Sequence, residues 1–196
     1  DVSPRGLAAL RKLSSKVRES APCLIFVNSR NAAETVSQRL AKLDSNLNIG
    51  VHHGSLAAET RHEMESALQD GILHALVCTS SLELGIDIGY LDLVVQIGSP
   101  KSIAKGLQRI GRAGHALRAI SKGRLVVFDS DDLIECAVLV RSAYGGHIDR
   151  VSVPEKATDV LAQSIIGMSL DRKWDSDEMY ELVTSAYPYR NPVSYT

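Results

Sequence analysis

The sequence predicts a parallel α/β fold, in which helices cover both faces of one sheet, followed by a small α-helical segment. Up to residue 130, short apolar runs alternate with segments of helical periodicity, a pattern typical of repeated strand–helix units. The apolar runs lack the alternation of a half-exposed strand, so both faces of the sheet are expected to be buried. Beyond residue 130 the readable segments are all helical.

Five strands and three helices are expected in the α/β part. The strands are predicted at residues 23–28, 48–53, 74–80, 91–98 and 123–130. The helices between them are predicted at residues 31–43, 57–71 and 102–114. Asn31 and Glu34 have the spacing of a capping box at the start of the first helix, and Gly71 is expected to end the second.

The C-terminal part is expected to be helical throughout. Helices are predicted at residues 131–146, 157–170 and 176–187, and residues 150–155 have the composition of a linker. We therefore expect one α/β domain over residues 1–149, and a linker with part of a second domain over residues 150–196.

Composition restricts the classes of function. The net charge is −1 and 44% of the residues are hydrophobic, so the chain can bury a core but is not basic as a whole. Nucleic-acid binding would therefore need local patches of charge. The three cysteines lie far apart without metal-ligand spacing and are expected to be core residues of a reducing compartment. With no signal peptide and no apolar run near 18 residues, we expect a soluble, cytosolic protein.

The expected strands end in polar sequences, which read NSR, HHGS, TSS and GSP. Ligands of parallel α/β sheets bind beyond the carboxyl ends of the strands. The working surface is therefore expected at this edge. His52 and His53 are adjacent in an extended segment and must point to opposite sides, so we expect one to be structural and one to face the surface.

The helix near residue 110 predicts an anion site. On a helix over residues 101–112, Ile103, Leu107 and Ile110 fall within roughly 60° of one another and form the expected buried face. The opposite face carries Lys101, Lys105, Gln108, Arg109 and Arg112. No Asp or Glu occurs between Leu93 and Phe128, and such an unbalanced cationic face favours a bound phosphate.

The phosphate must be held partly by another segment. The sequence contains no G-x-x-x-x-G-K-[ST] loop and no acidic pair placed to hold Mg²⁺. Arginines without a phosphate loop are typical of the other half of a composite site, in which an arginine finger accelerates phosphoryl transfer by about 10³–10⁵-fold.

Four segments in order resemble the motifs of superfamily 2 helicases. LIFVNSR (24–30) resembles motif IV, VHHGSL (51–56) the motif after it, TSSLELGIDIG (79–89) motif V, and QRIGRAGH (108–115) motif VI. The residues of motifs V and VI, together with DVLAQSIIGM (159–168), most closely resemble those of the large helicase-related (Lhr) family. The resemblance covers roughly residues 20 to 190 and implies the second RecA-like domain followed by the start of a winged helix.

The resemblance implies roles for the motif VI residues. Arg112 would be the arginine finger on the γ-phosphate of ATP, and Gln108 and Arg109 would line the same site. His115 stands where most of these helicases have arginine, and would contribute to the ATP site without a fixed charge. The cofactor would be ATP with Mg²⁺, held mainly by the first RecA-like domain, which is the expected partner domain. The chain by itself should not hydrolyse ATP.

Motifs IV and V imply contacts with both nucleotide and nucleic acid. Gly85 and Asp87 would face the nucleotide. The backbone of single-stranded DNA, or of a DNA:RNA hybrid or RNA, would be bound by Asn28, Ser29, Arg30, Gly54, Thr79 and Ser80. A different reading of Thr79 and Ser80 is a plain helix cap, with Glu83 reaching back.

Two other functions remain open at this point. One is an RNA helicase of the DEAD-box type, although motif VI begins with Gln instead of His. The other is a non-catalytic module that binds nucleic acid or protein. An upstream phosphate loop in the reading frame would favour the enzyme.

Overall fold

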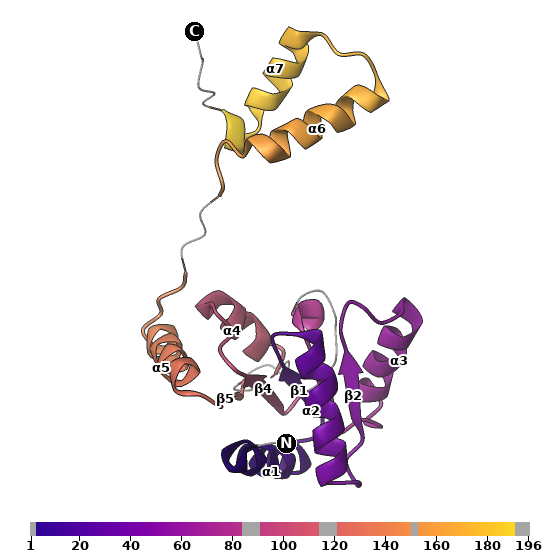
Figure 1. Cartoon of the computed structure of the whole chain (residues 1–196), viewed down its shortest axis with the longest axis vertical. Helices are drawn as coiled ribbons and strands as arrows, with labels where there is room; N and C mark the ends of the chain where they lie inside the picture. The colour runs from indigo at the N-terminus through magenta and orange to yellow at the C-terminus, as the bar shows by residue number, and fades with distance from the viewer. Residues whose placement is uncertain (1–2, 84–90, 114–120, 150–152, 191–196) are drawn as a thin grey trace. The chain divides into compact units, whose positions relative to one another are not determined.

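The structure is a computed structural model that describes residues 3–83, 91–113, 121–149 and 153–190. The chain forms two compact units, Asp1–Asp149 and Arg150–Thr196, which are described separately (Figure 1). Within the described residues, no helix is both long and apolar enough to cross a membrane.

The first unit is built on a parallel sheet, as predicted. Its strands run in the order β2-β3-β1-β4-β5, and every neighbouring pair is parallel. Their bounds are β1 Cys23–Phe26, β2 Ile49–His52, β3 Ala75–Cys78, β4 Leu93–Ile97 and β5 Gly123–Val126. Each strand lies inside its predicted range, and the four-residue cores of β1 and β3 are buried throughout. Burial raises the pKa of the Cys23 thiol to about 12.

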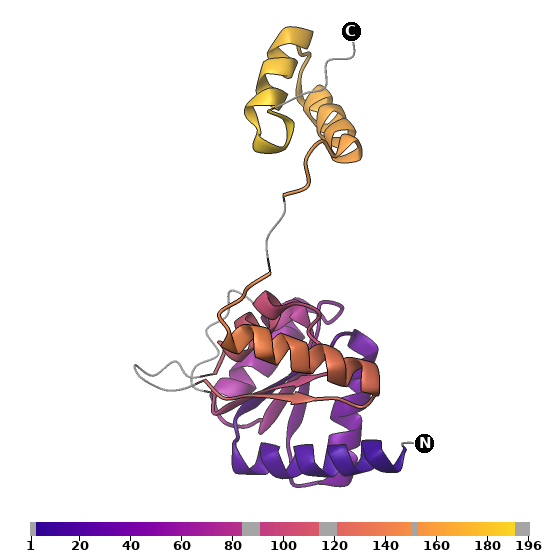
Figure 2. The same cartoon turned by 90° about the vertical axis from the view of Figure 1, so that its left-hand side faces the viewer.

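Helices cover both faces of this sheet. They are α1 Pro4–Glu19, α2 Arg30–Leu43, α3 Ala58–Gln69, α4 Ile103–Ile110 and α5 Ser130–Tyr144, with a short 3₁₀ helix, η1, at Ser80–Leu82. Successive residues of β1 serve opposite cores: Cys23 and Ile25 pack with α1 and α2, whereas Leu24 and Phe26 pack with α3 and η1. Figure 2 shows the indigo helix α1 and the orange helix α5 on opposite sides of the sheet.

One helix was not predicted, and one predicted helix cap is wrong. Helix α1 was not predicted, although Leu10, Leu13 and Val17 form its buried stripe and Ser3 accepts a hydrogen bond from the backbone N–H of Gly6 at 3.1 Å. The capping box at Asn31 is wrong. Ser29 caps α2 instead, because its backbone is extended and its Oγ accepts from the N–H of Ala32 at 3.1 Å.

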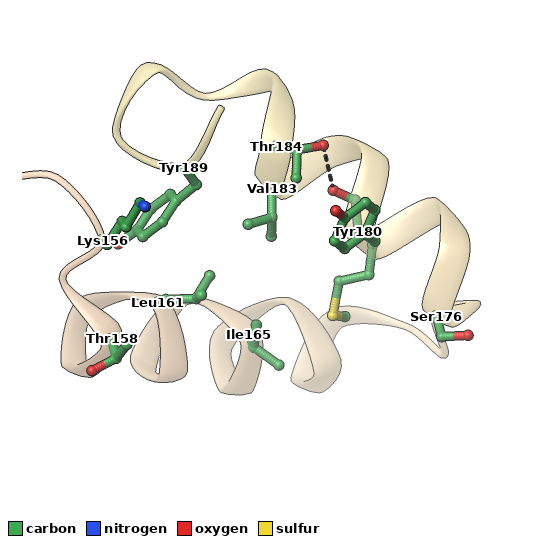
Figure 3. A pocket seen from close by; sticks show the side chains of 10 residues that line it. Lys156, Thr158, Leu161, Ile165, Ser176, Tyr180, Val183, Thr184 and Tyr189 are labelled. Carbon is green, nitrogen blue, oxygen red and sulfur yellow. Dashed lines mark hydrogen bonds between the residues drawn. The ribbon is translucent and has the colours of Figure 1, made fainter. Parts of the chain in front are cut away.

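The second unit contains two helices and a short 3₁₀ turn. They are α6 Thr158–Asp171, α7 Ser176–Ser185 and η2 Tyr187–Tyr189. Figure 3 shows Leu161 of α6 and Val183 of α7 directed into the space between the helices. They line an apolar pocket of about 550 Å³, and no described residue of either helix is fully buried.

Candidate functional site

The carboxyl ends of the strands meet at one edge and are held together by polar contacts. Asn28, after β1, donates from Nδ2 to the backbone oxygen of Ser99, after β4, at 2.8 Å. Arg30 donates from Nη1 to Oγ of Ser55, after β2, at 3.1 Å. The predicted polar edge therefore forms, and it brings the segments after β1, β2 and β4 into contact.

Arg109 is buried at the centre of a polar network and does not lie on an open face. Its side chain pairs with Glu83, whose Oε1 accepts from Nε at 2.7 Å and also from Nη2. From Nη1 it donates to Oε1 of Gln96 and, at 3.4 Å, to Oδ1 of Asn28. The guanidinium carbon lies 5.2 Å from the centre of the Phe26 ring. Only 5% of Arg109 is exposed. We call Arg109, Glu83, Gln96 and Asn28 the Arg109 network.

This arrangement corrects the prediction of an unneutralised cationic face on α4. Arg109 pairs with an acid 26 residues earlier in the chain. Lys101 pairs with Asp132 at 3.3 Å and Glu135 at 2.6 Å, both on α5. The expected buried face of Ile103, Leu107 and Ile110 lines a pocket together with residues of α5, but none of the three is fully buried, and Leu107 keeps 41% of its surface exposed. The tertiary fold thus supplies acids that the local sequence lacks.

Arg112 is held by the backbone just beyond α4. Its N–H donates to the carbonyl oxygen of Arg109 at 3.1 Å, and the N–H of Ala113 donates to Ile110 at 3.0 Å. Arg112 is half-buried, and Gln108 is exposed on the last turn of the helix. Gly85, Asp87 and His115 lie outside the described residues.

His52 and His53 point to opposite sides, as predicted, but both are buried. His52 contacts Ser81 Oγ through Nδ1 at 2.7 Å and Glu65 Oε1 through Nε2 at 2.8 Å, and is 1% exposed. His53 contacts Glu34 Oε1 through Nε2 at 3.1 Å and is 6% exposed. The expectation that one faces the surface is therefore wrong. Burial lowers the pKa of His52, and the hydrogen bond to Glu65 only partly opposes it.

The capping interpretation of Thr79 is wrong. Thr79 precedes η1 but makes no side-chain capping hydrogen bond, and the Glu83 carboxylate is bound by Arg109. Ser80 is exposed and Thr79 half-buried at the end of β3. A Cβ added to Gly54 would meet no atom within 4 Å, so open space adjoins the loop after β2.

Sequence reasoning missed Glu83 and Gln96 as members of the network. Gln96 is 2% exposed in a strand that is otherwise apolar. A lone amide in such a strand requires hydrogen-bond partners, and this was the available signal. Sequence reasoning also missed Asp149, whose Oδ2 accepts from Ser102 Oγ at 2.7 Å and from the N–H of Ala104 at 3.1 Å, at the start of α4. The hydrogen bond from Ser102 holds the pKa of Asp149 below its usual value.

Comparison with known proteins identifies the family. Residues 6–116 match the family described as "Helicase conserved C-terminal domain", and residues 141–192 match "Large helicase-related protein, winged helix domain". The chain belongs to the Lhr family of superfamily 2 helicases. Its first unit is the RecA-like C-terminal helicase domain, and a winged-helix region follows, as predicted.

Relatives match most of the Lhr chain. This chain is 46% identical over 193 residues to the ATP-dependent helicase Lhr-Core protein 2 of Thermococcus barophilus, and the match covers 97% of this chain and 22% of that protein. It is 36% identical over 199 residues to the Lhr helicase/uracil glycosylase of Escherichia coli, covering 86% of this chain and 13% of that protein. The chain therefore spans about a fifth or less of these relatives.

One solved structure is similar over nearly the whole Lhr chain. It is the Mycobacterium smegmatis helicase Lhr bound to ssDNA and AMP-PNP, with a TM-score of 0.89 and 38% identity. The match covers 93% of this chain and 25% of that one.

Proposed function

We propose that this Lhr chain is the second RecA-like half of an ATP-dependent helicase that moves along single-stranded nucleic acid. Arg112 is the arginine finger that reaches the γ-phosphate of ATP held by the first RecA-like half. The observation that carries this proposal is the burial of Arg109. Because Arg109 is bound to Glu83 inside the fold, we assign the contact with phosphate to Arg112, the other arginine of motif VI.

The donors at the end of α4 fit a phosphate group. A guanidinium offers a planar set of N–H donors that matches phosphate oxygens, and the exposed amide of Gln108 adds a further donor on the same turn. By the resemblance, Gly85, Asp87 and His115 complete this side of the nucleotide site, and Arg109 supports it from beneath. Mg²⁺ and the phosphate loop belong to the first half, so this chain alone does not hydrolyse ATP.

The strand-end residues bind the backbone of the nucleic acid. Thr79 and Ser80 offer hydroxyls that the structure does not use for capping, and Arg30 adds a positive charge. Asn28, Ser29 and Gly54 lie on neighbouring loops of the same edge. The bound ssDNA and AMP-PNP of the similar M. smegmatis protein support DNA and ATP as ligands. Contacts to phosphate and sugar predict little dependence on base sequence.

The finger is tested by Arg112→Ala in the complete helicase. We expect kcat for ATP hydrolysis to fall by about 1,000-fold while affinity for a dT oligonucleotide changes by less than about threefold. Lys105→Ala, at an exposed position of α4, is the matched control and should retain kcat. Equal losses of kcat and oligonucleotide affinity would instead place Arg112 on the nucleic acid.

The nucleic-acid surface is tested by two further variants. Thr79→Val keeps the shape of the side chain and removes its hydroxyl, so affinity should fall without a change in salt dependence. Arg30→Gln should reduce the slope of log K against log salt by about 0.7, the value for one phosphate contact to a single strand. Unchanged binding by both variants would remove this edge from the interface.

A further inference from the structure

We propose that the Arg109 network transmits nucleic-acid binding to the arginine finger. The ion pair of Glu83 and Arg109 is the central link, so Glu83 is a positioning residue for ATP hydrolysis. The inference rests on the proposed function, since it assumes that Thr79 and Ser80 contact the strand and that Arg112 contacts ATP.

Three consecutive contacts join Ser80 to Arg112. The N–H of Glu83 donates to the carbonyl oxygen of Ser80 at 3.1 Å. The Glu83 carboxylate accepts from Nε of Arg109 at 2.7 Å. The carbonyl oxygen of Arg109 accepts from the N–H of Arg112 at 3.1 Å. These three hydrogen bonds therefore connect the segment after β3 with the residues just beyond α4, and we call this series of contacts the path.

A second branch of the network reaches the end of β1. Asn28 accepts from Nη1 of Arg109 at 3.4 Å, and Gln96 accepts from the same nitrogen. Asn28 also donates to the backbone of Ser99 at 2.8 Å. The side chain of Arg109 is therefore oriented by groups that follow β1, lie within β4 and follow η1, and the segments after β1 and around η1 belong to the proposed nucleic-acid edge.

Burial of Glu83 and Arg109 restricts their movement relative to each other. Glu83 and Arg109 have side-chain exposures of 12% and 6%, so water competes weakly for their hydrogen bonds. The guanidinium is also held over the Phe26 ring. A displacement of Ser80 by a bound strand must then move Arg109 or break a buried pair. Because a buried charge is costly to leave unpaired, movement of α4 with Arg112 is favoured.

The test is Glu83→Gln in the complete helicase, which keeps the shape of the side chain and removes its charge. We measure ATP hydrolysis with and without a dT oligonucleotide, and affinity for the oligonucleotide and AMP-PNP separately. Both affinities should stay within about threefold, whereas the stimulation by DNA, measured as the ratio of stimulated to basal hydrolysis, should fall at least fivefold, within the usual range of coupling between sites.

Glu65→Gln is the matched control, because it neutralises a carboxylate that contacts His52 near the same edge but outside the path. It should retain the stimulation. If Glu83→Gln retains full stimulation, or if both variants lose it equally, the inference is overturned.

A second variant covers a failure of Glu83→Gln to fold. Glu83→Asp keeps the charge and shortens the reach to Arg109, and should also lose stimulation; full stimulation in this variant would overturn the inference. A normal kcat in Arg112→Ala would refute the proposed function. The coupling is tested independently of that result, because it is measured only as the ratio of stimulated to basal hydrolysis.

Discussion

Replacing Arg109 tests whether its main role is to pair with Glu83 inside the fold or to present a positive charge to solvent. Arg109→Met keeps a long unbranched side chain but removes the charge and the donors. Glu83 would then keep its carboxylate in a site where only 12% of the side chain is exposed. The Gln96 oxygen, in a residue that is 2% exposed, would lose its donor as well.

The expected cost is large for a single substitution. Removing one partner of a buried ion pair typically costs about 3–5 kcal/mol, because the other charge remains buried and uncompensated. For a domain of this size, 1 kcal/mol corresponds to about 3 °C in Tm. The Tm of the first unit should therefore fall by about 9–15 °C. An arginine on an open helix face would instead cost no more than about 0.5 kcal/mol.

The assay is urea unfolding of the chain, followed by circular dichroism, with the double variant Arg109→Met/Glu83→Gln as partner. Removing the unpaired Glu83 carboxylate should restore part of the lost free energy of unfolding, so the effects of the two substitutions should be non-additive by at least about 1 kcal/mol. A loss below about 1 kcal/mol in Arg109→Met, or strict additivity in the double variant, would refute the buried-pair argument.

Three other outcomes are expected. The unfolding free energy of the first unit should decline as pH falls below about 6.5, because the unfolded chain binds a proton at His52 there while burial keeps the pKa of His52 lower in the folded chain. His52→Gln should flatten the curve of unfolding free energy against pH, and an unchanged curve would contradict the assignment. Gly54→Ala should leave Tm within about 1 °C, because no atom lies within 4 Å of the added Cβ, yet weaken binding of a dT oligonucleotide; normal binding would show that no close approach occurs there. In hydrogen exchange, amides of α6 and α7 should exchange much faster than those of β1, because neither helix contains a buried residue; comparable protection would refute this.

The sheet was predictable because its signals are local. Runs such as residues 23–28 are apolar without interruption, and the parallel architecture follows from their alternation with helices. Helix α1 was also readable in principle, since Leu10, Leu13 and Val17 share one face and Pro4 follows a capping Ser3. Its omission was a failure to use a pattern that the sequence contains.

The Arg109 network could not be predicted in the same way. Arg109 and Glu83 lie 26 positions apart in the sequence with β4 between them, and no local spacing brings them together. A helical projection gives the relative directions of side chains on α4 but not which direction faces protein. The projection therefore placed all five polar side chains on one open face that was expected to bind an anion. The isolated amide of Gln96 in an apolar strand indicated that a polar partner had to be buried nearby, but not which one.

The direction of α4 bears on the proposed contact between Arg112 and phosphate. Backbone N–H groups at a helix start commonly bind phosphate, but at α4 this position is occupied by Ser102 and the carboxylate of Asp149. Arg112 lies at the other end, where the partial negative charge of the helix favours a cation and opposes a bare anion. A phosphate at that end requires the guanidinium and further donors from elsewhere. Under the proposed function, the end of α4 supplies half of a phosphate site, which the first RecA-like half would complete.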